Sequence, residues 1–227
     1  MRLFHKGFLT YGLGRLVGKA LLGLLALAGP AIADPVRVLA FGDSLTQGYG
    51  LVAQEGFVPQ LDAWVDEHGA EATIVNAGVS GDTTAGGAAR IDWSLTPDIG
   101  AMILTLGGND MLRGLDPSAA RENLDAILQS ARARDLPVLV VGMTAPGNFG
   151  PEYKQAFDAM YPDLAQAYGA LYFEDFFAGL GAGDPSELQR YFQPDGIHPN
   201  AEGVGLIVDA LGPKVLELIA RANAQER

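Results

Sequence analysis

The chain has 227 residues, a net charge of −12 and no cysteine. An acidic protein repels polyanions at long range, so nucleic acid and anionic membranes are excluded as expected partners. The absence of cysteine excludes a thiol nucleophile, disulfides and Cys-ligated zinc or iron–sulfur centres.

The first 33 residues are typical of a cleavable secretory signal. Four basic residues and no acidic one precede the apolar run of residues 21–27, and Ala31-Ile32-Ala33 matches an A-x-A cleavage site. A transmembrane anchor is the alternative, but two glycines and a proline interrupt the run well short of the ~20 residues that a span needs.

We therefore expect a cleaved signal in residues 1–33 and a single mature domain in residues 34–227. Cleavage removes four basic residues and no acidic one, which takes the net charge from −12 to −16. The expected location is periplasmic or secreted, without a stable membrane anchor. His5 leaves with the signal, so histidine chemistry in the mature chain rests on His68 or His198.

After the signal, short β-branched or apolar runs alternate with longer amphipathic segments, which indicates βαβ units and a mostly parallel sheet. The expected strands are residues 37–41, 73–76, 101–106, 137–143 and 170–173. The expected helices are residues 57–68, 84–95, 117–134, 152–168 and 201–222. In the third helix, Leu124, Ile127, Leu128 and Ala131 recur at the spacing of one buried stripe.

Four glycine-bearing turns lie where this pattern predicts a ligand crevice, because ligands of open α/β sheets bind beyond the carboxyl ends of the strands. Gly42-Asp43-Ser44 follows the first strand, "NAGVSGDTT" (76–84) the second and "GGND" (107–110) the third. "PDGIHPN" (194–200) directly precedes the last helix. We expect these turns to form the walls of one crevice.

These turns hold the groups that acyl transfer needs. A serine hydroxyl requires a base within hydrogen-bond reach, and the base requires a third group that orients it. Asp195 and His198 lie three residues apart in one compact turn, so the carboxylate can hold one ring nitrogen while the other faces Ser44. Candidate donors to a developing oxyanion are the backbone N–H groups of Ser44 and Gly81 and the amide of Asn109.

"GDSLT", "SGDTT", "GGND" and "DGIHPN" resemble, in order, the four blocks of the SGNH (GDSL-type) hydrolases. The resemblance spans about residues 36–220 and is greatest to the bacterial exported subgroup of arylesterases, acyl-CoA thioesterase I and lysophospholipases. "LGGNDMLRGL" and "APGNFGPEYKQAF" agree further with that subgroup.

The resemblance implies a role for each residue of the set. Ser44 is expected to be the nucleophile, His198 the general base and then acid, and Asp195 the acid that orients His198. Gly81 and Asn109 would complete the oxyanion hole with Ser44. The implied fold is a flavodoxin-like three-layer α/β/α sandwich with a mostly parallel sheet of about five strands.

Structural roles remain open for several of these residues. Ser44 could cap a helix, Gly81 could serve a turn of positive φ, and Asn109 and Asp110 could cap the turn after the third strand. Asp43 is expected to bond backbone amides of its own turn. Asp195 and His198 could be two metal ligands, but no further ligands stand at suitable spacing, so no metal or other cofactor is expected.

The sequence thus predicts a serine hydrolase whose partner is a small-molecule acyl ester or thioester, with a monomer assumed. Met111, Leu112, Pro146 and Phe149 follow strand ends, where they either line an acyl groove or cover the sheet edge. The strongly negative charge disfavours acyl-CoA relative to simple esters or lysophospholipids. A carbohydrate O-acetyl esterase is the alternative enzyme, and a non-catalytic exported binding protein is the alternative from another class.

Overall fold

The structure is a computed structural model that describes residues 35–182 and 184–225, so the expected signal segment of residues 1–33 lies outside the described residues. Within them, five parallel strands form one sheet in the order β2-β1-β3-β4-β5. The strands are β1 (Val36–Gly42), β2 (Ala72–Gly78), β3 (Ala101–Thr105), β4 (Val138–Val141) and β5 (Leu171–Phe173). The strand β1 lies between β2 and β3 and pairs with both, since Val38 pairs with Ile74 on one side and Ala101 on the other.

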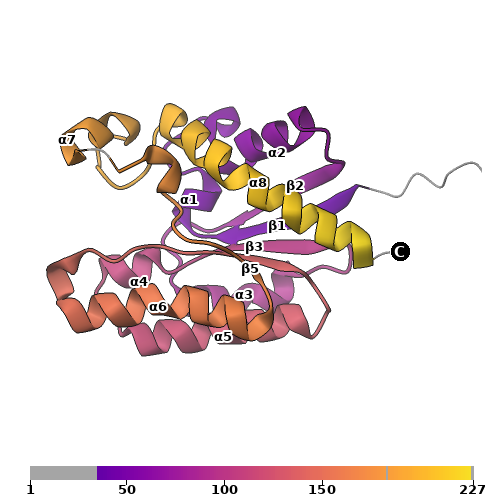
Figure 1. The fold of residues 1–227 in the computed structure, drawn as a ribbon, viewed down its shortest axis with the longest axis horizontal. Helices are drawn as coiled ribbons and strands as arrows, with labels where there is room; N and C mark the ends of the chain where they lie inside the picture. The colour runs from indigo at the N-terminus through magenta and orange to yellow at the C-terminus, as the bar shows by residue number, and fades with distance from the viewer. Residues whose placement is uncertain (1–34, 183, 226–227) are drawn as a thin grey trace, which may run out of the picture. The chain divides into compact units, whose positions relative to one another are not determined.

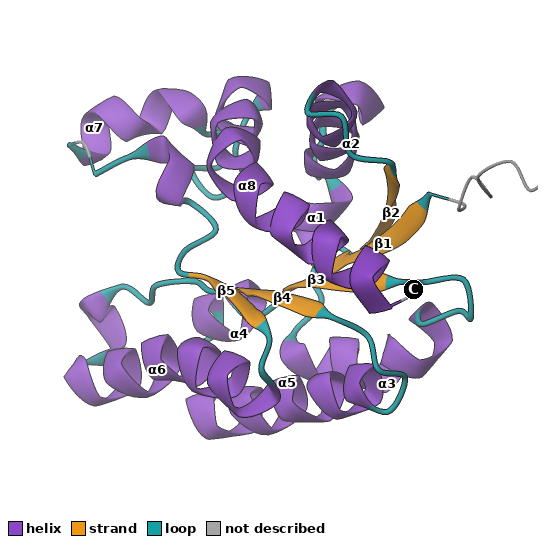
Figure 2. Ribbon diagram, turned by 45° about the vertical axis from the view of Figure 1, so that its right-hand side comes forward, coloured by secondary structure: helices purple, strands orange, loops and turns teal. Residues whose placement is uncertain are grey.

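Helices cover both faces of the sheet and make three layers (Figures 1 and 2). One face carries α2 (Phe57–Glu67) and α8 (Ala201–Gln225). The other carries α3 (Thr84–Ser94), α5 (Pro117–Arg132) and α6 (Pro151–Tyr168). Three short helices lie in connecting segments: α1 (Ser44–Gln47), α4 (Gly108–Leu112) and α7 (Pro185–Leu188).

This arrangement confirms the predicted three-layer α/β/α fold with its parallel sheet. Every expected strand and helix is present, with ends that shift by a few residues; β4, for example, is limited to Val138–Val141, within the expected 137–143. The sequence pattern missed α1, α4 and α7 because four or five residues are too few to show a helical repeat.

The core lies on both sides of the sheet. All residues of β3 and β4 are buried, as expected for strands covered on both faces. The predicted stripe of α5, from Leu124 to Ala131, is buried against the sheet. Asp116 caps α5 by accepting a hydrogen bond from the Ser118 N–H. No helix in the described part of the chain is long and apolar enough to cross a membrane.

A contact between α2 and α8 fixes the last helix, which begins three residues after His198. The Trp64 indole N–H donates to the Asp209 carboxylate at 3.0 Å. Gly212 lies against the indole ring so closely that a Cβ there would come within 2.6 Å of it. The middle of α8 is therefore anchored to α2.

Candidate active site

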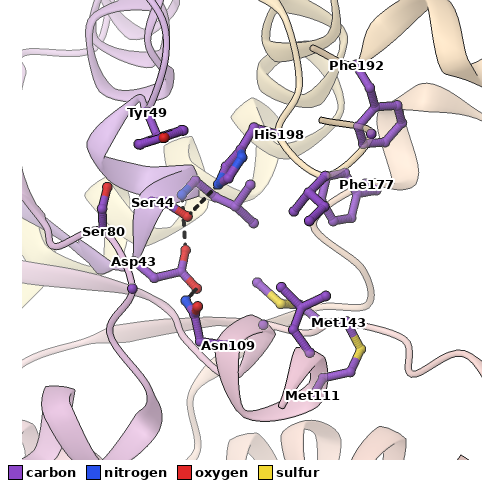
Figure 3. Close-up of a pocket in the computed structure, with 16 residues that line it drawn as sticks. Asp43, Ser44, Tyr49, Ser80, Asn109, Met111, Met143, Phe177, Phe192 and His198 are labelled. Atoms are coloured by element: carbon purple, nitrogen blue, oxygen red, sulfur yellow. Dashed lines mark hydrogen bonds between the residues drawn. The ribbon is translucent and has the colours of Figure 1, made fainter. Parts of the chain in front are cut away.

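A pocket of about 470 Å³ lies at the carboxyl ends of the strands, where the sequence predicts a crevice. Its walls come from the four glycine-bearing turns, which contribute Ser44, Gly81, Asn109 and His198. Figure 3 shows Ser44, Asn109 and His198 around this pocket. Residues more than 150 positions apart in the chain therefore face one cavity.

Ser44 is the first residue of α1, and Asp43 rather than Ser44 caps that helix. The Asp43 carboxylate accepts a hydrogen bond from the Leu45 N–H at 3.0 Å, which confirms the expected bond to an amide of its own turn. Because Asp43 fills the capping role, the Ser44 hydroxyl is free for another partner. It lies 2.8 Å from Nε2 of His198.

Glycines allow α1 to start this close to the sheet. A Cβ on Gly42 would lie 2.6 Å from the Thr105 carbonyl oxygen, and one on Gly78 would lie 2.3 Å from the Gln47 nitrogen. The first contact is with the backbone of β3 and the second with the backbone of α1, so a larger residue at either position would require the backbone to shift.

Asp195 and His198 form one compact turn that bends at Gly196, whose φ is +67°. The Nδ1 atom of His198 lies 2.7 Å from Oδ2 of Asp195. The other carboxylate oxygen accepts the backbone N–H groups of His198 at 3.0 Å and Ile197 at 2.9 Å. These hydrogen bonds, first the one from the His198 N–H, lower the pKa of Asp195 to about 2, so the carboxylate is ionised at neutral pH.

The two histidines of the described chain have different surroundings. The ring of Tyr49 covers one side of His198, with the ring centroids 4.7 Å apart. His68 instead ends α2, stacks on the Trp64 ring and does not line the pocket. Of the two, only His198 faces a serine.

The loop that carries Gly81 is tied to the end of β1. Gly81 has a φ of +83°, a conformation that favours glycine. Arg90 forms a salt bridge with Asp82 at 2.6 Å and donates to the Gly42 carbonyl at 2.9 Å. Arg113 donates to the Gly81 carbonyl at 2.9 Å. The peptide at Gly81 is therefore held from both sides.

Asn109 lies across the pocket floor from Ser44, and its amide is oriented by Asp43. The Asn109 Nδ2 atom donates to Asp43 Oδ2 at 3.2 Å (Figure 3). Since an amide nitrogen carries two hydrogens, this bond leaves the second one for a ligand. Asp43 is only 2% exposed, and this burial raises the pKa of its carboxyl to about 6.

The sequence suggested that Asp110 caps its own turn, but its carboxylate bonds to a different element. Its carboxylate accepts the backbone N–H of Thr84 at 2.8 Å and the Thr84 hydroxyl at 2.7 Å. Asn123 of α5 also donates to that hydroxyl, at 3.1 Å. Asp110 therefore joins α4 to the start of α3, and the two loops that hold Gly81 and Asn109 share one buried polar contact.

The remaining wall is apolar. Of the four residues predicted to line an acyl groove, Met111 and Leu112 line the pocket but Pro146 and Phe149 do not. The short 3₁₀ turn Gly147–Phe149 places the Phe149 ring 5.0 Å from the Tyr153 ring, outside the cavity. The other apolar residues of the lining, which the sequence analysis did not single out, are Leu45, Tyr49, Met143, Phe177, Phe192 and Ile197.

Three of these missed residues had a usable sequence signal, since Leu45 and Ile197 lie within the motifs "GDSLT" and "PDGIHPN". Met143 follows the end of β4, just as Met111 follows the end of β3, so the strand-end rule could have found it. Phe177 and Phe192 lie in irregular segments with no periodicity. Among the described residues, no group of histidine and carboxylate side chains is arranged to hold a metal ion.

Comparisons with known proteins agree on the kind of molecule. The GDSL-like Lipase/Acylhydrolase family matches residues 40–206. Esterase TesA of Pseudomonas aeruginosa is 34% identical over 199 residues, which are 87% of this chain and 96% of TesA. Thioesterase 1/protease 1/lysophospholipase L1 of Escherichia coli is 33% identical over 83% of this chain and 86% of its own. The crystal structure of AlinE4, an SGNH-hydrolase family esterase, has a TM-score of 0.67 and 42% identity, covering 82% of this chain and 98% of AlinE4.

Proposed function

Because the chain belongs to the GDSL-like lipase/acylhydrolase family and is an ester-hydrolysing enzyme, we propose that it cleaves carboxylic esters or thioesters through an acyl-enzyme on Ser44. One observation carries this proposal: Ser44, His198 and Asp195 form a continuous hydrogen-bonded chain, with distances of 2.8 and 2.7 Å, at the edge of an apolar pocket. This is the geometry that activates a serine hydroxyl at neutral pH.

The reaction then follows from the position of each group. Oγ of Ser44 attacks the acyl carbonyl carbon while Nε2 of His198 takes its proton. The imidazolium that forms is stabilised by the ionised Asp195 carboxylate. His198 next returns the proton to the leaving alcohol or thiol. Water, deprotonated by the same nitrogen, attacks the acyl-enzyme, and His198 returns this proton to Oγ of Ser44 as the bond to the acyl carbon breaks and the acid is released.

The oxyanion of each tetrahedral intermediate requires donors on the opposite side of the carbonyl. The backbone N–H of Ser44 stands at the start of α1, where helical N–H groups have no partner within the helix. The N–H of Gly81 and the second hydrogen of the Asn109 amide complete the set. The hydrogen bond to Asp43 orients the Asn109 amide before substrate arrives, and Arg113 holds Gly81 by donating to its carbonyl oxygen.

The apolar lining favours an acyl chain over a sugar as the group beside Ser44. Met111, Met143, Phe177 and Phe192 offer hydrophobic surface and few hydrogen-bond partners for hydroxyl groups. We therefore rank esters with longer acyl chains above a carbohydrate O-acetyl ester. Among the former, simple esters and lysophospholipids suit the strongly acidic protein better than the polyanionic acyl-CoA.

Two measurements test the proposed reaction. A phosphonate ester should label the wild type covalently, and Ser44→Ala should remain unlabelled and inactive on a chromogenic ester. Labelling that persists in Ser44→Ala would reject Ser44 as the nucleophile, and a wild type that neither reacts nor turns over would favour a non-catalytic binding protein. A series of esters from acetyl to long acyl chains separates the two enzyme functions, because strong preference for acetyl would favour the O-acetyl esterase.

The proposed enzyme is exported and acts in the periplasm or outside the cell. The signal pattern of residues 1–33 supports this proposal. Sequencing the amino terminus of the protein recovered from the periplasm or the medium should give a start at Asp34. Recovery of a chain that still begins at Met1 in the cytosol would contradict it.

A further inference from the structure

The bond between Ser44 and His198 joins two segments that are 154 residues apart in the chain. The nucleophile segment, residues 43–50, extends from the end of β1 through α1. The histidine turn, residues 193–199, lies between a 3₁₀ turn and α8. Each segment is well ordered by its own hydrogen bonds, but those bonds do not determine the distance between the two segments.

Gln193 is the first residue of the histidine turn, and its side-chain amide connects the two segments. Its Nε2 atom donates to the Tyr49 carbonyl oxygen at 2.8 Å and to the Pro199 carbonyl oxygen at 3.0 Å. The first acceptor belongs to the nucleophile segment and the second to the far end of the histidine turn. The two hydrogens of one amide nitrogen thus match two backbone oxygens on opposite sides of the site.

The backbone of Gln193 also closes the turn around His198. Its N–H donates to the His198 carbonyl at 2.8 Å, and its carbonyl accepts the Gly196 N–H at 2.9 Å. Gln193, at the beginning of the turn, therefore contacts its bend at Gly196, the histidine and its last residue, Pro199. A shift of this residue would carry His198 with it.

Gly50 shows that the nucleophile segment is shaped to accept this amide. Its φ is +76°, and a Cβ at this position would lie 2.1 Å from Oε1 of Gln193. Tyr49, which provides the carbonyl acceptor, is also the residue whose ring covers His198. The sequence "QGYG" (47–50) thus fits the Gln193 side chain in two independent ways.

We propose that Gln193 is a positioning residue whose side-chain amide clamps the histidine turn to the nucleophile segment and sets the Ser44–His198 distance. This role rests on the proposed function of Ser44 and His198. A base must lie within about 2.6–3.2 Å of the hydroxyl that it deprotonates, and misplacement by 1 Å can lower a rate about 10²-fold. The clamp acts on that distance and does not touch substrate.

The first test replaces Gln193 with methionine, which keeps the length of the side chain and removes both donors. We expect Gln193→Met to lower kcat about 10- to 100-fold and to slow phosphonylation of Ser44 by a similar factor. KM for a soluble ester should stay within about twofold of the wild-type value, because the apolar lining is unchanged. The matched control is Gln189→Met, since the Gln189 amide is exposed and makes no hydrogen bond to the described residues.

A second variant tests the donated hydrogens themselves. Gln193→Glu keeps the shape, but an ionised carboxylate faces two carbonyl oxygens and donates to neither. When the acid is protonated it regains one donor, so its activity relative to the wild type should rise at least about threefold between pH 8 and pH 5. The same ratio for Gln193→Met should not change, because methionine does not titrate. If Gln193→Met fails to fold, the ratio for Gln193→Glu decides alone.

The clamp is rejected if Gln193→Met keeps the wild-type kcat and rate of phosphonylation, if Gln189→Met loses as much activity, or if the activity of Gln193→Glu relative to the wild type does not depend on pH. These results differ from a failure of the proposed function, which would show as labelling or turnover in Ser44→Ala. A wild type labelled at Ser44 together with a fully active Gln193→Met would reject the clamp alone.

Discussion

The two sides of the pocket are stabilised in different ways. On the strand-end side, which holds Ser44, Gly81 and Asn109, the supporting carboxylates are buried: Asp43 is 2% exposed and Asp110 is 3% exposed. On the histidine side, the Asp195 side chain is 37% exposed, and its turn is held by hydrogen bonds near the surface. The carboxylates that support the strand-end side are therefore part of the folded core, whereas the turn with Asp195 and His198 is attached near its surface.

Because of this difference, substitutions on the histidine side should change activity without changing stability, whereas substitutions on the strand-end side should change both. Changes on the histidine side should remove chemistry and leave the core intact. Changes on the strand-end side should disturb buried polar groups whose partners cannot be replaced easily by water. Four variants test this comparison, and their expected effects decrease in the order in which they follow.

The largest effect is expected from His198→Ala. Without the base, kcat should fall on the order of 10⁴-fold or more, because the serine hydroxyl loses its proton acceptor. The midpoint of thermal unfolding should shift by no more than a few degrees, because the ring lies at the pocket edge. Ester hydrolysis and calorimetry on the same preparation measure both. A large loss of stability would remove the distinction between the two sides.

Asn109→Ala should lower kcat about 10²–10³-fold by removing one oxyanion donor. It also leaves Oδ2 of the buried Asp43 without its side-chain partner, so a moderate loss of stability of about 1–2 kcal/mol should accompany the loss of rate. Asn109→Asp is a useful control, since it keeps the size but cannot donate when ionised. A chromogenic ester turned over by Asn109→Ala at nearly the wild-type rate would contradict the proposed role.

Asp43 predicts a pH dependence of stability. Burial raises the pKa of its carboxyl to about 6, so between pH 4 and pH 6 the folded protein holds a proton that the unfolded chain has released. This contribution to stability is complete below pH 4 and is lost as the pH rises through 6, by about 3 kcal/mol in total. Asn at this position does not titrate. The free energy of unfolding of Asp43→Asn, measured in denaturant, should therefore rise by that amount relative to the wild type between pH 4 and pH 7.

If the difference in the free energy of unfolding between Asp43→Asn and the wild type stays constant from pH 4 to pH 7, Asp43 does not titrate in that range.

Asp195 provides the opposite case. Its pKa is lowered to about 2, so its interactions in the folded state are present above pH 4 and are lost only as the pH falls towards 2. The two carboxyl groups of the site therefore respond to pH in separate ranges and in opposite directions.

The smallest expected effect concerns Thr46 in α1, which is fully buried. Its hydroxyl has no hydrogen-bond partner among the described residues. Thr46→Val has a similar shape and removes the unpaired group, so it should stabilise the protein by about 1 kcal/mol and raise the unfolding midpoint by roughly 2–4 °C. Activity should stay within about twofold. Destabilisation by Thr46→Val would mean that the hydroxyl has a partner in solution.

The sequence predicted the long elements because each repeats its pattern over several turns or a whole strand. The buried stripe of α5 and the buried strand β3 are examples. The sequence also predicted that four distant turns lie at one edge of the sheet, because parallel strands have their carboxyl ends at the same edge. Their convergence on one pocket agrees with this prediction; the catalytic roles of Ser44, Asp195 and His198 stay predictions.

Other parts of the site depend on contacts that no local pattern encodes. Pro146 and Phe149 follow a strand end, yet the 3₁₀ turn there directs Phe149 onto Tyr153. Phe177 reaches the pocket from an irregular segment. The link from Gln193 to Tyr49 joins residues 144 positions apart, and a single sequence carries no signal for such a pair.

The turn that contains both Asp195 and His198 has a consequence for motion. Their hydrogen bond spans three residues of local backbone, so it does not depend on how distant elements pack. If the turn moves as a rigid body, Nε2 withdraws from Ser44 while Asp195 keeps the proton on Nδ1. The imidazole would then retain the tautomer that the proposed mechanism requires. A return to activity requires only translation of the turn, with no ring flip and no exchange of protons with solvent.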